Sequence, residues 1–397
     1  MGVLEMVNDV YIVAAKRTAI GTFGGTLKPL SAIELAVPVV KEIIQSLNIN
    51  NKDVDEVIIG NVFKSGIKGN PARQVAIQSG LHHTTPAITI DKQCGSGLKA
   101  LMLGANEIKL GQADLIITGG VENMTNVPHI VLNGRWGSKL GDLKTVDALT
   151  HDGLHCAIEN YHMGVTAENL AEKFDISREE QDEYALKSQQ KAESAISNGK
   201  FKEEIIPLHL QTRKGKIVFD EDEHPRKTSL DKLSTLRSAF KQNGTVTAGN
   251  ASGLNDGASI IMLASADAVN RYGLQPLGKV VSYASAAVEP SLMGIGPVPA
   301  SRKALESAKM TIDEMDLVEI NEAFAAQVLA VNKELNVDEK KLNVNGGAIA
   351  LGHPVGCSGS RIVVTLLHEL KKRKEKMGLA TLCIGGGQGV TVIVEAI

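Results

Sequence analysis

Short apolar runs alternate with segments of helical periodicity in the first third of the chain. The runs are rich in β-branched residues, as buried strands are, and cover residues 10–15, 57–59, 87–90 and 114–118. Between them, apolar residues recur at helical spacing over residues 31–48, 71–79 and 97–110. Alternation of this kind predicts an α/β layer fold.

The pattern changes between residues 121 and 250, where loops, a long polar helix and a hairpin are predicted. Ser177 and Glu180 form a capping box at the start of that helix, which ends near Gly199. Strands are predicted over residues 203–210 and 216–219, around the turn Arg213-Lys214-Gly215. Alternation resumes with strands predicted over residues 259–264, 279–286 and 315–320. We therefore expect an N-terminal half (1–120 with 251–272), an inserted loop domain (121–250) and a C-terminal half (273–397).

Three segments recur in the same order at similar offsets, which indicates an internal duplication. Residues 55–63 resemble 316–324, residues 96–99 resemble 358–361, and residues 117–120 resemble 383–386. In a duplicated fold, corresponding loops at the ends of two sheets can face one shared cleft. Cys94 and His353 are expected to meet there.

Composition narrows the possible partners and location. The 397 residues are 43% apolar with a net charge of −3, so neither nucleic acid nor an anionic membrane is expected as the main partner. Residues 1–9 contain no basic leader region, and no apolar run approaches the ~20 residues that span a bilayer. A soluble, cytoplasmic protein is expected. The four cysteines form no CxxC pair, which favours neither a disulfide framework nor a zinc site.

Cys94 opens the segment CGSGLKA (94–100), which leads from a predicted strand into a helix. The positive end of that helix is expected to lower the pKa of the thiol and enrich the nucleophilic thiolate. Gly95 and Gly97 permit a tight turn and close approach of a bulky thioester. Taken alone, such a cysteine is more often a small buried apolar residue, so the assignment depends on its neighbours.

Three further polar side chains are candidates for chemistry. His353 lies in a glycine-rich segment (343–359) and could accept a proton from Cys94, although a single loop histidine is often structural. Cys383 ends a predicted strand before three glycines, whose amides could bind an oxyanion. Asn321 could orient a water molecule or, equally well, cap the helix that follows it.

The motifs CGSGLKA (94–100), NEAF (321–324), GHPVGCSG (352–359) and CIGGG (383–387) together resemble the thiolase family, and within it the acetyl-CoA C-acetyltransferases. The likeness covers essentially the whole chain. It implies the thiolase fold, which consists of two duplicated α/β halves in αβαβα layers with an inserted loop domain.

The resemblance also implies a reaction. Two acetyl-CoA condense to acetoacetyl-CoA and CoA, or the reverse thiolysis occurs, by a ping-pong mechanism through acetyl-Cys94. His353 would activate Cys94 and, with water held by Asn321, stabilise the thioester oxyanion. Cys383 would remove the α-proton of the second acetyl-CoA, and the amides of Cys94 and Gly385 would support the other oxyanion. The thioester is a substrate, so no cofactor or metal is implied.

Family-like positions in the inserted domain and directly after it imply contacts with coenzyme A. His162 and Ser252 would lie along pantetheine, and Met163 would limit the acyl pocket to short chains. Arg226 is a candidate phosphate contact, but the family pattern is shifted there by about one residue, so it could be a solvated surface charge. The likeness further implies a homotetramer built as a dimer of dimers.

Several alternatives stay open at this point. A degradative 3-ketoacyl-CoA thiolase with a broader chain-length range has the same motifs. A ketoacyl synthase would share the fold but typically pairs its cysteine with two histidines, whereas Asn321 and Cys383 stand here. A non-catalytic acyl-CoA binder is disfavoured because all four polar site residues are present, and a thiol redox protein because CxxC is absent. A regulatory disulfide between Cys94 and Cys383 would need bonding geometry that the sequence does not define.

Overall fold

The computed structural model describes residues 8–212 and 215–397. The expected absence of a leader rests mainly on residues 1–7, which lie outside the described residues, as do Arg213 and Lys214 of the predicted hairpin turn. None of the described helices combines the length and the apolar composition needed to cross a membrane.

A ten-stranded sheet runs through the described part of the chain in the order β12-β13-β14-β11-β1-β10-β5-β3-β4, with β2 added beside β10. Its first-half strands are β1 (Val10–Arg17), β2 (Gly21–Thr22), β3 (Glu56–Gly60), β4 (Ala87–Ile90), β5 (Leu115–Asn123) and β10 (Asn255–Ser265). Its second-half strands are β11 (Gly278–Ala287), β12 (Leu317–Ile320), β13 (Met377–Ile384) and β14 (Gln388–Ala396). All the strands predicted from β-branched runs outside the inserted segment are present.

The two halves repeat one topology. In the first half, β3 pairs in parallel with β5, which pairs antiparallel with β10, and β10 pairs antiparallel with β1. In the second half, β12, β13, β14 and β11 are connected in the same sequence of parallel and antiparallel pairs. The halves join where Tyr11 and Ile12 of β1 pair with Lys279 and Gly278 of β11. The predicted duplication is therefore present in the fold.

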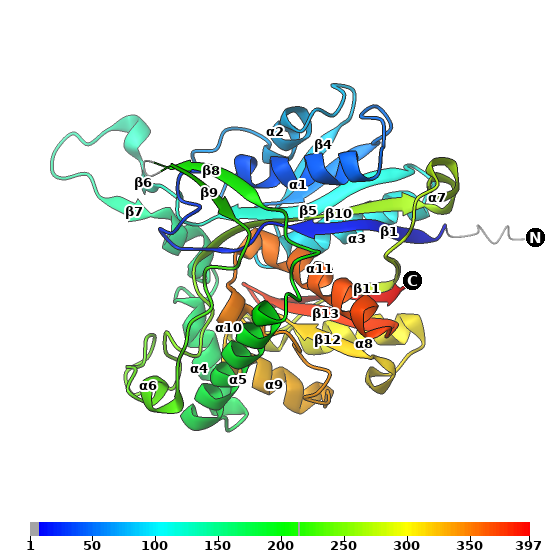
Figure 1. Ribbon diagram of the computed structural model, residues 1–397. Coiled ribbons are helices and arrows are strands. Elements are labelled where there is room, and N and C mark those ends of the chain that lie inside the picture. Colours follow the sequence, from blue (N-terminus) through cyan, green and yellow to red (C-terminus); the bar gives the residue numbers. More distant parts are fainter. Residues whose placement is uncertain (1–7, 213–214) are drawn as a thin grey trace, which may run out of the picture.

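Helices form three layers around the two halves of the sheet (Figure 1). Helices α1 (Ala32–Ser46) and α2 (Pro71–Gln78) cover the outside of the first half, and α8 (Pro297–Ala308) and α9 (Ala325–Leu335) cover the outside of the second. Helices α3 (Ser96–Lys109) and α11 (Val355–Arg373) lie between the halves. From Val355 to Leu370, every residue of α11 is buried, as expected of a helix packed on all sides. This arrangement confirms the predicted αβαβα layers.

One of the three predicted sequence matches has the wrong register. Ile117 of β5 pairs with Val57 of β3, and the corresponding Val318 of β12 pairs with Leu379 of β13. The structural counterpart of Ile117 is thus Leu379, and not Cys383 as the alignment of 117–120 with 383–386 implied. The glycines that produced that match lie inside β5 in one half and in the turn after β13 in the other. Glycines that align between two sequences indicate similar local backbone turns, but they do not define which residues pair between strands.

The segment between β5 and β10 contains the remaining elements of the predicted insertion, β6 (His129–Val131), β7 (Thr145–Asp147), α4 (Met163–Lys173), α5 (Arg178–Ser197), β8 (Leu208–Thr212), β9 (Gly215–Phe219) and α6 (Leu230–Ser234), with single turns at Gly134–Trp136 and Thr150–Leu154. The capping box of Ser177 and Glu180 is confirmed, and Gly199 with a φ of 65° follows the end of α5. The strand predicted over residues 203–210 begins only at Leu208, so residues 203–207 precede β8. Because β5 continues to Asn123, the first residues assigned to the insertion belong to the sheet, and the domain division itself stays a prediction.

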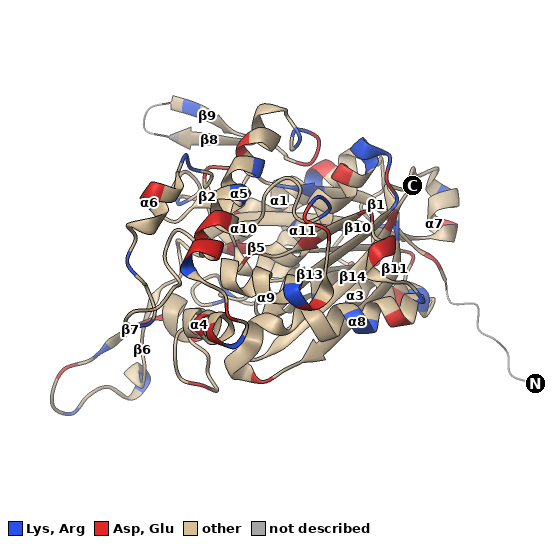
Figure 2. Ribbon diagram, turned by 90° about the horizontal axis from the view of Figure 1, so that it is seen from below, with Lys and Arg blue, Asp and Glu red and all other residues tan. Residues whose placement is uncertain are grey.

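Short helical segments complete both halves: α7 (Ala266–Tyr272) follows β10 in the first half, and the turns Pro290–Ile295 and Ile312–Glu314 and α10 (Ala348–Leu351) lie in the second. Charged residues of both signs are interspersed along the outer helices and loops, whereas the central strands are mostly uncharged (Figure 2). This distribution follows from the layers, since strands covered on both faces are surrounded by apolar side chains.

Candidate active site

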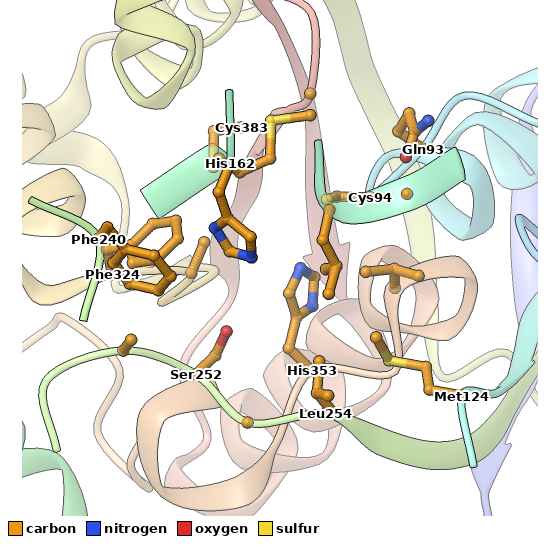
Figure 3. A pocket seen from close by; sticks show the side chains of 18 of the residues that line it. Gln93, Cys94, Met124, His162, Phe240, Ser252, Leu254, Phe324, His353 and Cys383 are labelled. Atoms are coloured by element: carbon orange, nitrogen blue, oxygen red, sulfur yellow. The ribbon is translucent and has the colours of Figure 1, made fainter. Parts of the chain in front are cut away.

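A cavity of about 390 Å³ brings together residues from both halves and from the inserted segment. Cys94, His353 and Cys383 all line it, as do Gly385, His162, Met163, Ser252 and Arg226. Figure 3 shows the side chains of Cys94, His162 and His353 directed into the same space, with Cys383 beside them. Eight of the nine predicted site residues therefore converge on one cavity, and Asn321 is the exception.

Cys94 sits at the turn between β4 and α3, where Gln93 adopts a left-handed conformation with a φ of 48°. The two glycines that follow are required by packing. A Cβ on Gly95 would lie 2.5 Å from Ile384 Cδ1, and one on Gly97 would lie 2.9 Å from the carbonyl oxygen of Gly356. The glycines therefore let the first turn of α3 approach β13 and α11, which places the Cys94 thiol at the junction of the two halves.

The electrostatic environment of Cys94 differs from the one expected from its position before a helix. Burial raises the pKa of the thiol to about 11, although hydrogen bonds from the amides of Gly385 and of Cys94 itself favour the thiolate. The predicted lowering of the pKa is wrong because removal of the sulfur from water outweighs the backbone dipoles. Cys94 is therefore a neutral thiol near pH 7 and needs a base to become a nucleophile.

His353 lies on the turn between α10 and α11 and is 5% exposed. Burial, with a smaller contribution from the charge of Arg361, lowers the pKa of the imidazole to about 4. Its Nδ1 atom contacts the hydroxyl of Ser358, whereas Nε2 has no hydrogen-bonding partner among the described residues. The ring is therefore neutral near pH 7 and presents a free nitrogen at the cavity.

Cys383 is the penultimate residue of β13 and is 1% exposed. Burial and the proximity of Cys94 both raise the pKa of its thiol. A thiol with a raised pKa gives a strongly basic thiolate once its proton is lost. Gly385 follows two residues later, and its amide donates to the sulfur of Cys94, so the end of β13 supplies a thiol and the turn after it supplies a backbone donor.

Asn321 is fully buried directly after β12 and does not line the cavity. Both polar atoms of its side-chain amide lack a hydrogen-bonding partner among the described residues. The alternative of a helix cap is wrong, because Phe324 is the residue before α9 and no side chain caps that helix. An unpaired buried amide costs about 1–3 kcal/mol, which is consistent with a site for bound water beside the cavity.

The predicted coenzyme A residues occupy the cavity walls and its rim. His162 caps α4 by accepting from the amide of Gly164 at 3.0 Å, and its ring stacks on Phe240 with centroids 4.5 Å apart. Met163 begins α4 and lies against Gly385, since a Cβ there would be 2.6 Å from the Met163 methyl group. The exposed Arg226 donates to the carbonyl of Ala248 at 2.8 Å, so its guanidinium is held at the cavity and does not extend freely into solvent.

The sequence interpretation missed the apolar wall of the cavity. It is formed mainly by Met124, Leu154, Phe240, Leu254, Met293 and Phe324. These residues come from six separate segments, and of them only Phe324 lies in one of the four motifs, NEAF (321–324). Apolar residues in loops carry no periodic signal, so only their convergence identifies them.

No group of three or more His, Cys, Asp or Glu side chains suited to a metal ion occurs within residues 8–212 and 215–397. The polar groups at the cavity include two thiols, imidazoles, a hydroxyl, the guanidinium of Arg226 and the side-chain amide of Gln93, and backbone amides lie beside them. This set is suited to nucleophilic attack, proton transfer and oxyanion binding.

Comparison with known proteins gives a consistent result. Residues 10–267 match the family model "Thiolase, N-terminal domain" and residues 274–396 match "Thiolase, C-terminal domain". The chain is 53% identical to the acetyl-CoA acetyltransferase of Pseudomonas aeruginosa over 386 residues, covering 97% of this chain and 98% of the other. It superposes on the crystal structure of the Bacillus anthracis acetyl-CoA acetyltransferase with a TM-score of 0.97 at 46% identity, covering 99% and 100% of the two chains. A TM-score of 0.95 at 45% identity, with 99% of each chain covered, relates it to human mitochondrial 3-ketoacyl-CoA thiolase in complex with CoA.

Proposed function

The chain belongs to the thiolase family, and on that premise we propose that it is an acetyl-CoA C-acetyltransferase. It condenses two acetyl-CoA to acetoacetyl-CoA and CoA, and it cleaves acetoacetyl-CoA in the reverse direction. The observation that carries this proposal is the presence of Cys94, His353 and Cys383 on one cavity.

In the first half-reaction, His353 Nε2 takes the proton of Cys94 as the sulfur attacks the thioester carbonyl. The imidazolium and a water held by Asn321 donate to the developing oxyanion. The C–S bond to CoA breaks, the leaving thiolate takes its proton from Cys383, and acetyl-Cys94 remains. Because the pKa of His353 is about 4, the ring is neutral near pH 7, and its free Nε2 is able to accept the proton of Cys94.

In the second half-reaction, the Cys383 thiolate removes the α-proton of a second acetyl-CoA. The resulting enolate attacks acetyl-Cys94, and the amides of Cys94 and Gly385 donate to the tetrahedral oxyanion. The C–S bond to Cys94 then breaks, and the sulfur recovers its proton from His353. Donors of this kind are each worth about 3–4 kcal/mol in the transition state.

Coenzyme A is proposed to enter along the inserted segment, with Ser252 and His162 beside pantetheine and Arg226 near the phosphates. The solved human relative carries CoA in its structure. We further propose, on family likeness, that no metal or resident cofactor is needed and that the protein is a cytoplasmic homotetramer. Activity after dialysis against a chelator tests the absence of a metal requirement, and sedimentation analysis tests the homotetramer.

A second candidate function is that of a 3-ketoacyl-CoA thiolase with a broader range of chain lengths. The close structural likeness to the human mitochondrial enzyme of that name favours it. The two candidates share the chemistry and differ in the space available for the acyl chain, so kcat/KM measured over a series of 3-ketoacyl-CoA lengths separates them.

The decisive experiment measures cleavage of acetoacetyl-CoA with free CoA by the wild type, Cys94→Ser and Cys383→Ser. Both variants are expected to lose at least about a hundredfold in kcat. Incubation with acetyl-CoA followed by mass spectrometry is expected to find an acetyl group on Cys94 in Cys383→Ser and none in Cys94→Ser. Cys156→Ser is the matched control, because Cys156 is buried away from the cavity. Absence of cleavage by the wild type, or acetylation at another residue, would overturn the proposal.

A further inference from the structure

We propose that Glu122 is a positioning residue, whose buried carboxylate in the N-terminal half holds the beginning of α11 and thereby sets His353 relative to Cys94. The inference rests on the proposed role of His353. It concerns a residue in β5 that does not line the cavity.

The carboxylate of Glu122 joins segments that are distant in the sequence. It is fully buried and accepts hydrogen bonds from the amides of Val62 at 3.0 Å and Phe63 at 3.1 Å. The side chain of Asn61 donates to it at 2.7 Å, and the amide of Gly356 donates at 3.0 Å. Four donors thus converge on one carboxylate, three from the loop after β3 and one from the first turn of α11.

The contact with Gly356 replaces a missing helix cap. Pro354 occupies the cap position of α11, and no side chain from within the helix end accepts a hydrogen bond there. Glu122 supplies the acceptor from the other half of the molecule, at the positive end of the helix. The fit leaves no spare room, since a Cβ on Gly356 would lie 2.6 Å from Glu122 Oε2. His353 stands directly before Pro354, so the anchor of α11 is also an anchor of the histidine turn.

A second buried carboxylate holds the other side of the same turn. Glu322 accepts from the amide of Ile349 in α10 at 3.1 Å and from the hydroxyl of Ser188 at 2.7 Å. The amide of His353 itself donates to Asn255 Oδ1 at 2.9 Å. The turn is therefore held by hydrogen bonds before, at and after the histidine. Of these contacts, the one with Glu122 connects the turn to the half of the molecule that carries Cys94.

The loop held by Glu122 also borders the catalytic cavity. Val62 and Phe63 pack in one apolar cluster with Met124 and Val355, against which Cys94 also packs. Loss of the carboxylate would therefore loosen both the helix end beside His353 and the wall beside Cys94. A displacement of about 1 Å between reacting groups can cost about a hundredfold in rate.

The test compares Glu122→Gln with Glu369→Gln. Glutamine has the same shape, but its amide group would point hydrogen atoms at backbone donors. Glu369 is a matched control because it is 2% exposed, lies near the other end of α11 and is similarly hydrogen-bonded, to Asn345, Lys200 and Arg373. Burial, with a smaller contribution from Asp91, raises the pKa of Glu122 to about 7, so assays at about pH 8 keep the carboxylate ionised.

Glu122→Gln is expected to lower kcat for acetoacetyl-CoA cleavage at least about tenfold, with KM changed less than about threefold. Its rate of Cys94 alkylation by iodoacetamide is expected to fall as well, which reports on the Cys94–His353 pair without substrate. Glu369→Gln is expected to lower Tm without either effect. If the wild type fails to cleave acetoacetyl-CoA, the proposed function fails, and the alkylation rates still decide the role of Glu122.

The proposal is overturned if folded Glu122→Gln keeps kcat and the alkylation rate within about twofold of the wild type, or if Glu369→Gln loses them equally. Should Glu122→Gln not fold, Asn61→Ala decides in its place, because it removes one donor to the carboxylate and keeps the charge. A kcat-selective loss in that variant supports the proposal. An unchanged kcat rejects it.

Discussion

His353 Nδ1 lies 2.5 Å from the hydroxyl oxygen of Ser358, and the same oxygen lies 2.9 Å from the carbonyl oxygen of Pro354. A hydroxyl has one proton, and a carbonyl oxygen only accepts, so Ser358 donates to Pro354 and accepts from His353. The imidazole therefore carries its proton on Nδ1. Its free Nε2 lone pair faces the cavity and is available to Cys94.

Replacement of Ser358 by alanine is expected to lower kcat by about tenfold to a hundredfold, because the ring loses the group that fixes its orientation and tautomer. KM for acetoacetyl-CoA is expected to change little. Ser360→Ala is the matched control, since Ser360 is buried on the same helix and, among the described residues, donates only to the carbonyls of Ser259 and Cys357. Steady-state kinetics of both variants provide the comparison, and equal losses in the two would speak against a special role for Ser358.

The pKa values of Cys94 and His353 predict a particular pH dependence of thiol reactivity. With a thiol pKa of about 11 and an imidazole pKa of about 4, both groups are neutral near pH 7. Since the thiolate fraction then rises about tenfold per pH unit below the thiol pKa, alkylation of Cys94 by iodoacetamide is expected to accelerate steadily between about pH 6 and 9. A plateau across that range would instead indicate a preformed thiolate–imidazolium pair.

Variants of Asn321 and Gln327 separate an effect on stability from an effect on catalysis. Both are fully buried, and the two polar atoms of each side-chain amide lack a partner among the described residues. Replacement of Gln327 by leucine removes unpaired polar groups that cost about 1–3 kcal/mol, so its Tm is expected to be retained or raised, whereas Asn321→Leu also removes the partner of the proposed water. Only Asn321→Leu is expected to reduce kcat, by about a hundredfold, because it removes the proposed water site. Calorimetry and kinetics on the two variants check this, and a Tm loss confined to Asn321→Leu would show that its amide is paired.

Met163 is expected to limit the length of the acyl chain. Its methyl group lies directly against Gly385 and its side chain lines the cavity. Met163→Ala is expected to raise kcat/KM for 3-ketohexanoyl-CoA relative to acetoacetyl-CoA by about tenfold, because the shorter side chain leaves room in the cavity for additional methylene groups of the substrate. Met102→Ala, in the core around α3, is the control that loses stability without changing the ratio. An unchanged ratio in Met163→Ala would place the limit elsewhere in the apolar wall.

Local features of this protein could be predicted from the sequence because they depend on residues close along the chain. The strand of β4, the capping box of Ser177, the turn at Cys94 and the glycine-rich segment around His353 each follow from the periodicity or backbone preferences of a few neighbours. The order of the four thiolase-like motifs then predicted the αβαβα layers and the meeting of Cys94, His353 and Cys383.

Tertiary structure alone decided what depends on distant neighbours. Desolvation raises the pKa of Cys94 against the expected effect of its helix, because burial is a property of all surrounding residues and not of the local turn. The register of β13 against β12, the apolar wall around Phe240 and the bond from Gly356 to Glu122 likewise join segments that no local pattern connects. Long-range contacts carry no periodic signal along the chain, so these features exist only once the two halves have packed together.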